Sequence, residues 1–269
     1  MAHKALTLSI VIPVFNEQRH LESCLLAIAA QTVTPTEVIV VDNNSTDESL
    51  HIARKFDFVT IINEPQQGIV FARNAGFNAA KSKVIGRIDA DTILPPDWVA
   101  QVLEFYQDPA HAKQALTGGG YFYNVQLPRF NGYMQSQVVY RMNRFIAGHY
   151  ILWGSNMALP CKAWQDVAKS TCEDHDYHED LDLAIHLHRL GYDINYQTGL
   201  KVGVYLKRVW NLREQQTIHM ERWPLTLRMH GYHLWWMGKL GNVVLWYVAQ
   251  PAVLIANLIA RLFNRQAER

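Results

Sequence analysis

The sequence predicts an α/β fold built on a mostly parallel, doubly wound sheet, and three observations lead to this prediction. Apolar runs of strand length alternate with helical patterns four times in about ninety residues. These runs are rich in Ile and Val and lack a regular polar alternation, which is typical of parallel strands covered on both faces. Polar side chains follow most of the runs, so they should lie together at the carboxyl edge of the sheet, where ligands bind in such folds.

The length and composition make a soluble globular enzyme the default expectation. With 269 residues, of which 49% are hydrophobic, the chain can bury a substantial core as one large or two fused domains. Its 25 basic and 24 acidic side chains leave a net charge of +1, so we expect no nucleic-acid partner. Three widely separated cysteines and an opening without a signal-peptide pattern lead us to expect a reducing cytosol.

The first half of the chain alternates strands and helices in a regular order. The expected strands lie at residues 6–14, 37–41, 58–62 and 84–88. The expected helices lie at residues 18–30, from the polar segment 42–47 to Lys55, and from Gly68 to Ala79. This alternation implies right-handed crossovers between parallel strands. Neither a glycine-rich dinucleotide fingerprint nor a Gly-Lys-Ser/Thr loop occurs, so phosphate must be bound in another way.

Two carboxylates follow the fourth expected strand. Asp89 and Asp91 should point the same way, with Ala90 turned to the other side. Hard oxygen ligands this close together suit Mg²⁺ or Mn²⁺ with positions left open for phosphate, so a metal-bridged diphosphate is the first hypothesis. The alternative is that the pair only caps a turn and the next helix. Arg73 could add a guanidinium for the phosphates, or it could form only a surface ion pair.

Six segments, in family order over about 180 residues, resemble the motifs of family 2 glycosyltransferases of the GT-A fold. They are residues 10–17 (IVIPVFNE), 40–47 (VVDNNSTD), 68–76 (GIVFARNAG), 89–91 (DAD), 154–158 (GSNMA), and 179–180 (ED) followed by 189–192 (RLGY). The resemblance implies a Rossmann-like, mostly parallel sheet with helices on both faces. It also implies a nucleotide-diphosphate sugar as the donor.

The resemblance further implies which residues bind the donor. Glu17 and Asp42 would lie around the nucleoside, with Asp42 reading the base. Asp89 and Asp91 would bind ribose, metal and diphosphate, both of them as ligands of Mg²⁺ or Mn²⁺. The expected nucleotide-binding residues are Pro13, Glu17, Asp42, Arg73 and Asp89.

Glu179 and Asp180 stand just before an apolar helical stripe that ends at Gly191. Carboxylates in the first turn of a helix are stabilised by its macrodipole, so N-terminal capping is a sufficient physical explanation. Glycosyl transfer also needs a base that takes the proton of the acceptor hydroxyl, and a carboxylate is a usual choice. By resemblance, Asp180 is this base, and Glu179 orients it or contacts the acceptor. Family members of this type invert the anomeric carbon in one displacement.

The second half of the chain has a less regular pattern. We expect helices at residues 97–106, 130–150 and 210–222, and strands at residues 115–123, 194–196 and 200–206. In the resembled family, Asn156 borders the place where donor and acceptor meet and could bind a sugar hydroxyl; alternatively, Gly154 and Ser155 only lead into a strand. Residues 219–223 resemble the Gln-x-x-Arg-Trp motif of processive synthases, with His219 in place of Gln. Trp223 could stack on an acceptor sugar or lie in the core.

Two further sequence patterns bear on a possible zinc site and on possible membrane binding. Cys172, His175 and His178 are spaced as in some zinc sites, but a single thiolate without a second Cys-x-x-Cys does not predict one. Residues 240–260 carry no charge, yet their polar residues and Pro251 weaken the case for a bilayer span. An interfacial helix or helix pair fits better, with a core or dimer helix as the alternative.

We expect residues 1–110 to form the nucleotide-sugar-binding half and residues 111–228 the acceptor-binding half of one GT-A domain, followed by membrane-associating helices over residues 229–269. The predicted function is the metal-dependent, inverting transfer of a single sugar from a nucleotide-diphosphate sugar to a glycan or lipid-linked acceptor. The expected nucleotide is UDP. This transfer would serve cell-envelope or polysaccharide synthesis in the cytoplasm, at the inner face of the cell membrane. The alternatives are a polyprenyl-phosphate glycosyltransferase and a catalytically silent scaffold or glycan-binding partner.

Overall fold

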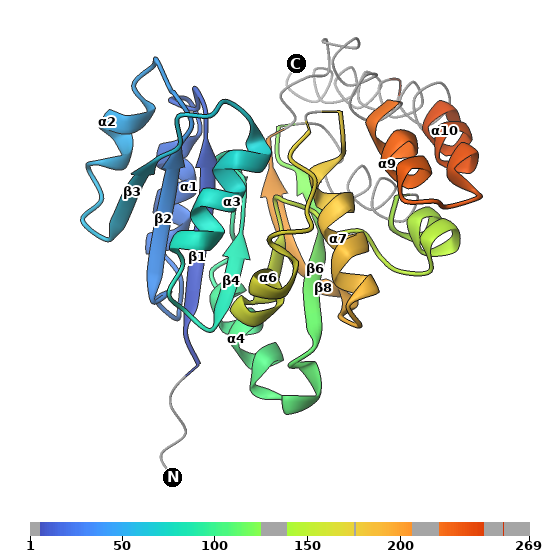
Figure 1. Cartoon of the computed structure of the whole chain (residues 1–269). Coiled ribbons are helices and arrows are strands. Elements are labelled where there is room, and N and C mark those ends of the chain that lie inside the picture. Colours follow the sequence, from blue (N-terminus) through green and yellow to red (C-terminus); the bar gives the residue numbers. More distant parts are fainter. Residues whose placement is uncertain (1–5, 125–138, 175, 206–220, 245–254, 256–269) are drawn as a thin grey trace, which may run out of the picture.

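The computed structural model describes residues 6–124, 139–174, 176–205, 221–244 and 255. These residues fold around one eight-stranded sheet with the strand order β3-β2-β1-β4-β7-β6-β8-β5. Helices cover both faces of the sheet, with α3, α6 and α7 on the side nearer the viewer in Figure 1. The predicted α/β class with helices on both faces is therefore confirmed.

The first half of the chain forms the parallel part of the sheet. Its strands are β1 (Leu8–Val14), β2 (Glu37–Asp42), β3 (Val59–Asn63) and β4 (Val84–Arg87), and β1 pairs in parallel with both β2 and β4. The connecting helices are α1 (Leu21–Ala29), α2 (Ser49–Ala53) and α3 (Ile69–Ala79). All four strands and all three helices occur where the sequence predicts them, with ends that differ by a few residues.

The two faces of β1 illustrate why the sheet is covered on both sides. Ile10 and Ile12 are buried in one apolar cluster with residues of α1, while Val11 is buried in a second cluster with residues of α3. Successive side chains of a strand point to opposite faces, so a continuous apolar run needs a helix on each side. On the α3 side, a side chain at Gly76 would overlap Val11, which explains the glycine at this close approach.

The second half of the chain extends the sheet with mixed pairings. The added strands are β5 (Thr92–Ile93), β6 (Gln114–Phe122), β7 (Met157–Pro160) and β8 (Asp193–Val204). The described helices of this half are α4 (Trp98–Gln107), η1 (Pro109–His111), residues 139–147, α6 (Cys161–Val167), α7 (Glu179–Arg189), α9 (Trp223–Met229) and α10 (Trp235–Val244). β7 is antiparallel to both β4 and β6, and β5 is antiparallel to β8, whereas β6 and β8 are parallel.

Two features of this half differ from the sequence expectation. The two short strands expected at residues 194–196 and 200–206 are one strand, β8, because both parts pair with β6. The register jumps between Gly118 paired with Gln197 and Gly119 paired with Lys201, so an irregularity separates the two parts. Gly154 and Ser155 do lead into a strand, β7, which forms the link between the two halves of the sheet.

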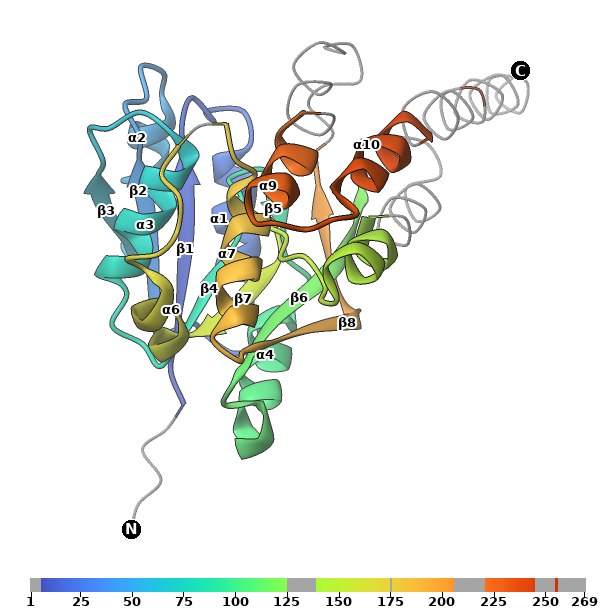
Figure 2. The same ribbon diagram turned by 45° about the vertical axis from the view of Figure 1, so that its right-hand side comes forward.

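A third apolar cluster lies beside the sheet, where α7 packs against α9 (Figure 2). Leu181 and Ile185 of α7 meet Trp223 and Leu227 of α9 in this cluster, together with Tyr140. Among the described helices, none combines the length and the apolar character that crossing a bilayer requires. Most of the stretch 240–260 lies outside the described residues, as does most of the helix expected at residues 210–222.

Candidate active site

The carboxyl ends of β1, β2 and β4 meet at one edge of the sheet, and sharp turns follow β1 and β2. Asn16 and Asn44 adopt positive φ angles of 54° and 65°, a left-handed conformation that Asn tolerates better than most residues. The side chain of Asn16 accepts a hydrogen bond from the amide of Thr46 at 2.8 Å, so the two turns support each other. Both loops are therefore held in fixed positions beside β4.

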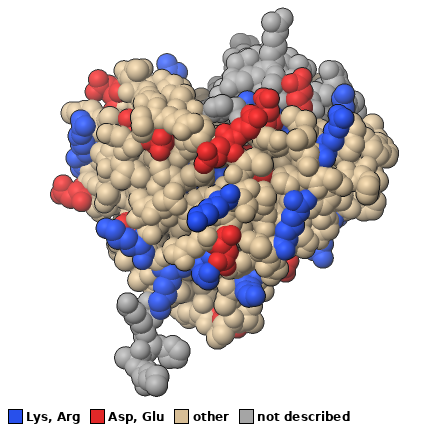
Figure 3. All heavy atoms as spheres, viewed as in Figure 1, with Lys and Arg blue, Asp and Glu red and all other residues tan. Residues whose placement is uncertain are grey.

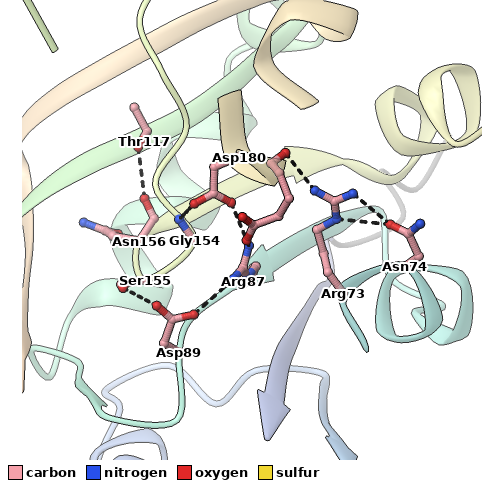
Figure 4. Close-up of polar contacts among 10 residues, drawn as sticks. Arg73, Asn74, Arg87, Asp89, Thr117, Gly154, Ser155, Asn156 and Asp180 are labelled. Carbon is pink, nitrogen blue, oxygen red and sulfur yellow. Dashed lines mark hydrogen bonds and ion pairs between the residues drawn. The ribbon is translucent and has the colours of Figure 1, made fainter. Parts of the chain in front are cut away.

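A buried arginine, Arg87, is the centre of the candidate site. As the last residue of β4 it is 2% exposed, and its guanidinium is bonded to three carboxylates (Figure 4). Nη1 donates to Asp180 Oδ1 at 2.7 Å and to Glu179 Oε1 at 2.8 Å, and Nη2 donates to Asp89 Oδ1 at 3.2 Å. One side chain thus joins the acidic pair after β4 to the acidic pair that begins α7.

The charged groups in this cluster shift one another's pKa values. Burial acts against a charged Arg87, but the carboxylates of Asp180, Glu179 and Asp89 keep its pKa above the usual range, so it stays a cation. Burial also opposes ionisation of Glu179, yet the charges of Arg87, His178 and Arg73 lower its pKa. Burial and the neighbouring Glu179 raise the pKa of Asp180. Two adjacent carboxylates with pKa values moved in opposite directions are typical of acid and base assignments in active sites.

The segment before β7 fixes both acidic groups from the other side. The amide of Gly154 donates to Asp180 Oδ2 at 2.7 Å. Ser155 Oγ donates to Asp89 Oδ2. A side chain at position 154 would overlap the guanidinium of Arg87, so the glycine is required for this close approach. The residues Gly154 and Ser155 therefore position Arg87, Asp89 and Asp180 together.

The expected metal ligands Asp89 and Asp91 follow β4, next to the buried thiol of Cys24, which lies 3.7 Å from the main-chain oxygen of Asp89. Burial raises the pKa of Cys24 well above its usual range, and the negative charges of Asp91, Asp89 and Glu17 raise it further. Among the described residues, these three carboxylates do not form a group whose ligand atoms all lie within 4.8 Å of one another. Asp91 is 5% exposed, whereas 34% of the Asp89 side chain is exposed. On the surface of the molecule, a band of acidic side chains crosses the upper middle of the face seen in Figure 3, over the segment before α7. Oxygen donors without competing thiolate or imidazole are the ligands that Mg²⁺ and Mn²⁺ prefer.

The residues expected around the nucleoside occupy the same edge. Pro13 lies in β1 beside Val41 of β2, and Glu17 follows in the loop after β1, with its amide donating to Ser49 Oγ at 2.7 Å. Asp42 is the last residue of β2 and is 6% exposed; its Oδ1 accepts from the amide of Ser45 at 3.1 Å. The arrangement brings these residues to one side of Asp89 and Asp91, and their contacts with a nucleotide stay a prediction.

Arg73 is fully buried, so the surface ion pair considered for it is excluded. Its Nη1 donates to the main-chain oxygen of Glu179 at 3.0 Å, and its Nε and Nη2 donate to Asn74 Oδ1 at 3.1 Å and 2.9 Å. Arg73 therefore ties α3 to the first turn of α7. Its direct contact with phosphate stays a prediction.

The structure places the two expected acceptor residues inside the protein. Asn156 is fully buried and donates to the main-chain oxygens of Gly119 and Leu200 at 3.0 Å and 2.8 Å. Its side-chain oxygen accepts from Trp98 Nε1 at 2.9 Å. Trp223 is 3% exposed, and its Nε1 donates to Asn143 Oδ1 at 3.2 Å. Both side chains thus have protein partners that hold the scaffold together.

Sequence reasoning gave no role to Arg87, and it gave Gly154 and Ser155 only a place in a motif or at the start of a strand. A signal for Arg87 was present, because a basic residue at the end of an apolar strand must be paired with acids if it is buried. The partners themselves could not be read from the sequence, since Arg87 and Asp180 are 93 residues apart.

The fold and the carboxylate-rich edge define a protein of the nucleotide-sugar transferase class. The model of the family "Glycosyl transferase family 2" matches residues 9–167, more than half of the 269 residues. The chain therefore belongs to glycosyl transferase family 2. It is 35% identical to the chondroitin synthase of Pasteurella multocida (strain Pm70) over 111 residues, 39% of this chain and 12% of that protein. The matches span a third or less of the length of the curated relatives, from 11% to 33%.

Solved structures show the same architecture. The mannosyltransferase PcManGT from Pyrobaculum calidifontis, in complex with GDP-Man and Mn²⁺, has a TM-score of 0.65 and 20% identity, covering 98% of this chain and 76% of that chain. Glucosyl-3-phosphoglycerate synthase from Mycobacterium tuberculosis, in complex with UDP, has a TM-score of 0.61 and 18% identity, covering 84% and 81%. At these identities the likeness shows the fold alone, and the predicted GT-A fold is confirmed.

Proposed function

We propose that this chain is a metal-dependent, inverting glycosyltransferase that moves a single sugar from a nucleotide-diphosphate sugar to a hydroxyl of a glycan or lipid-linked acceptor. One observation carries the proposal: the guanidinium of Arg87 bonds Asp89 at 3.2 Å and Asp180 at 2.7 Å. A donor-binding carboxylate and a candidate base therefore lie within the reach of one side chain. Catalysis of transfer needs these two functions close together.

Asp180 is the group proposed to take the proton of the acceptor hydroxyl. Its position is fixed by Arg87 on one oxygen and by the amide of Gly154 on the other. Each carboxylate oxygen can accept a further hydrogen bond, so the acceptor hydroxyl can approach without breaking either contact. The raised pKa of Asp180 favours proton transfer from a hydroxyl near neutral pH. Glu179 is ionised beside Arg87 and orients Arg87 and Asp180. Its negative charge would also stabilise a cationic transition state.

Asp91 and Asp89 are the residues proposed to hold Mg²⁺ or Mn²⁺. We assign Asp91 as the principal ligand and Asp89, whose two oxygens accept hydrogen bonds from Arg87 and Ser155, as the second. A bound divalent ion would offset the charge of the leaving diphosphate. Glu17, Asp42 and Pro13 would line the nucleoside, with residues 1–110 as the donor half and residues 111–228 as the acceptor half.

A screen of nucleotide sugars tests this function. We expect the chain to release UDP, or another nucleoside diphosphate, from one sugar nucleotide when Mg²⁺ or Mn²⁺ is present and not in chelator alone. The product formed on an added glycan or lipid-linked acceptor should have the opposite anomeric configuration, which NMR can establish. Calorimetry that detects no metal-dependent binding of any nucleotide would instead favour a catalytically silent scaffold.

A polyprenyl-phosphate glycosyltransferase is the second enzymatic candidate. Its acceptor is a phosphate, which needs less base catalysis than an alcohol. Retention of most activity by an Asp180→Asn variant would favour this candidate.

A peripheral position on the inner face of the cell membrane is part of the proposal. Met229, Trp236 and Leu240 are exposed on α9 and α10, close to the basic residues Arg228 and Lys239. Exposed apolar and basic side chains on short helices are features of interfacial binding. Co-sedimentation with anionic vesicles should fall when Trp236 and Leu240 are both changed to Ser, while the folded chain remains intact by circular dichroism.

A further inference from the structure

A second group of potential metal ligands lies behind the candidate base, on the side of α7 that faces α9. Cys172 Sγ, a carboxylate oxygen of Asp182, His186 Nε2 and His230 Nε2 all lie within 4.8 Å of one another. Asp182 and His186 are one turn apart on α7, Cys172 precedes this helix, and His230 follows α9. Figure 2 shows α7 and α9 side by side. The four side chains therefore come from three separate parts of the chain.

The contacts among these side chains converge on Asp182. His230 Nε2 lies 2.8 Å and His186 Nε2 lies 3.4 Å from Asp182 Oδ1. Asp182 is completely buried, and its Oδ2 accepts from the amide of Cys172 at 2.9 Å. His186 Nε2 is buried and has no hydrogen-bond partner among the described residues, although 3.4 Å separates it from the carboxylate. A buried imidazole nitrogen that lies 3.4 Å from a buried carboxylate oxygen, without a well-formed hydrogen bond to it, is spaced as two ligands of one cation would be.

We propose that Cys172, Asp182, His186 and His230 form a zinc site that joins α7, α9 and the segment before α7. One sulfur, two imidazole nitrogens and one carboxylate oxygen are a donor set typical of tetrahedral Zn²⁺. Zinc–ligand bonds of about 2.0–2.3 Å place tetrahedral ligand atoms roughly 3.3–3.8 Å apart, so shifts of about 1 Å or less would form the site.

The other group of potential ligands, His178, Glu179 and Asp180, does not compete for this assignment. There, Arg87 Nη1 is bonded to both carboxylates and already supplies the positive charge. Around Asp182, the basic groups in contact are imidazoles, which can bind a metal in their neutral form.

One contact must change for His230 to bind zinc. Arg189 Nη1 lies 3.0 Å from His230 Nδ1, and Arg189 Nη2 donates to the main-chain oxygen of His230 at 2.6 Å. An imidazole that binds metal through Nε2 carries its proton on Nδ1, so Nη1 and Nδ1 would both be donors. Arg189 is exposed and can turn away while keeping the bond to the carbonyl. An Arg189→Gln variant, whose amide oxygen can accept from Nδ1, should bind zinc at least as tightly as the natural chain.

The proposed site would stabilise the helix that carries Asp180. Asp182 is two residues beyond Asp180 on α7, and the bonds through zinc would attach this turn to α9. Zinc binding would release the thiol proton of Cys172 and any proton shared by Asp182 and the two imidazoles, so affinity should rise with pH. The role is structural, and the inference does not depend on which sugar the chain transfers.

Metal analysis of the purified 269-residue chain tests the site. After incubation with Zn²⁺ and dialysis, we expect one tightly bound zinc per chain. The Asp91→Asn variant should retain it, since that change affects only the proposed catalytic metal. Cys172→Ser and His230→Gln should weaken zinc binding by more than the roughly 10–100-fold that loss of an outer hydrogen-bond partner causes. Cys161→Ser and His188→Gln, which lie outside the cluster, are the matched controls and should retain the zinc.

Cobalt substitution and thermal unfolding give readouts independent of activity. Co²⁺ should produce tetrahedral absorption bands and a thiolate-to-cobalt charge-transfer band, and the latter should vanish in Cys172→Ser. Zn²⁺ should raise the unfolding temperature of the natural chain and leave that of the folded Cys172→Ser variant unchanged. A folded chain without stoichiometric zinc, or equal zinc contents in the cluster variants and their controls, would overturn the proposal. Asp182 would then be a carboxylate that only accepts hydrogen bonds from its neighbours.

Discussion

Arg87 Nη1 lies 2.7 Å from Asp180 Oδ1, and the same guanidinium reaches Asp89 with Nη2 at 3.2 Å. Asp89 follows β4 and Asp180 belongs to the first turn of α7, so the arginine connects the sheet to the helix across the candidate site. The guanidinium of Arg87 neutralises the charge of these carboxylates. It also fixes the distance between Asp89 and Asp180, because a planar guanidinium donates hydrogen bonds in defined directions.

We expect Arg87→Lys to reduce kcat while the KM for the donor changes little. Lysine keeps the charge but cannot bond Asp89 and Asp180 in the same fixed geometry, and misplacing a catalytic group by about 1 Å costs roughly 10²-fold. Arg87→Met should be worse, since an uncompensated buried charge costs about 3–5 kcal/mol of folding free energy. Steady-state kinetics and denaturant unfolding of both variants provide the measurement. Equal kcat values for Arg87→Met and the natural chain would contradict the positioning role.

Replacing the proposed base should slow the transfer step and leave nucleotide affinity nearly unchanged. Asp180→Asn retains the shape of the side chain and an oxygen that can accept from Gly154, but it cannot take a proton. We expect kcat to fall by roughly 10²–10⁴. Nucleotide affinity measured by calorimetry should stay within a factor of a few. Asp97→Asn, at an exposed aspartate of the first half, is the matched control and should be fully active.

A single methyl group at position 154 should disturb the same ion cluster. The Cβ of Gly154→Ala would overlap Arg87, so the guanidinium must leave its position between Asp180 and Asp89. We expect a loss of kcat of about 10²-fold together with a lower unfolding temperature. Gly199→Ala provides the comparison, because its Cβ would meet no atom within 4 Å. If both alanine variants behave alike, Gly154 has no role in holding Arg87.

The first half of the fold could be predicted because each strand and helix carries its own local pattern. Continuous apolar runs identify parallel strands, and the polar residues at their ends, such as Asp42 and Asp89, mark the ligand edge without knowledge of the pairing. The strand β7 has only four residues, so the sequence offered it only as an alternative interpretation of Gly154 and Ser155 and did not reveal its pairing with β4 and β6. The position of β5 at the far edge beside β8 depends on a long-range pairing that no local pattern encodes.

Polar and aromatic residues of a motif can also serve the scaffold. The motif predicts Asn156 as an acceptor residue, and this stays a prediction; in the structure its amide holds β6 and β8 together through Gly119 and Leu200. Trp223 packs in the cluster between α7 and α9. In each case the amino acid suits both uses, and the scaffold contacts could be found only from the three-dimensional neighbours.

Loss of the proposed metal ligand should weaken nucleotide binding and leave the chain folded. With Asp91→Asn we expect UDP or GDP to bind weakly and equally with and without Mn²⁺, whereas the natural chain should bind more tightly when Mn²⁺ is present. The reason is that an amide lacks the negative charge that holds a divalent ion. Asp97→Asn again serves as the control. A metal-stimulated affinity that survives in Asp91→Asn would exclude this residue as the principal ligand.

Acid should destabilise the folded chain through His149, which is 3% exposed. Its Nδ1 lies 2.7 Å from the main-chain oxygen of Tyr150, and its ring centroid lies 4.7 Å from the tilted ring of His188 and 6.5 Å from the edge-on ring of Tyr232. Burial, assisted by the charge of His188 and of Arg189 and opposed by the Tyr150 hydrogen bond and by Asp193, lowers the pKa of His149 from 6.5 to about 4.

Between these two pKa values the unfolded chain binds a proton at this residue that the folded chain does not. The free energy of unfolding should therefore fall as the pH drops from 6.5 toward 4, by about 3 kcal/mol if the full pKa difference is expressed. His149→Gln cannot titrate, so its unfolding free energy should depend less steeply on pH in this window, whatever its stability at neutral pH. Denaturant unfolding of both chains across the window measures the two slopes. Parallel slopes would show that His149 protonates equally well in the folded state, and that its burial in this cluster carries no cost for the charged form.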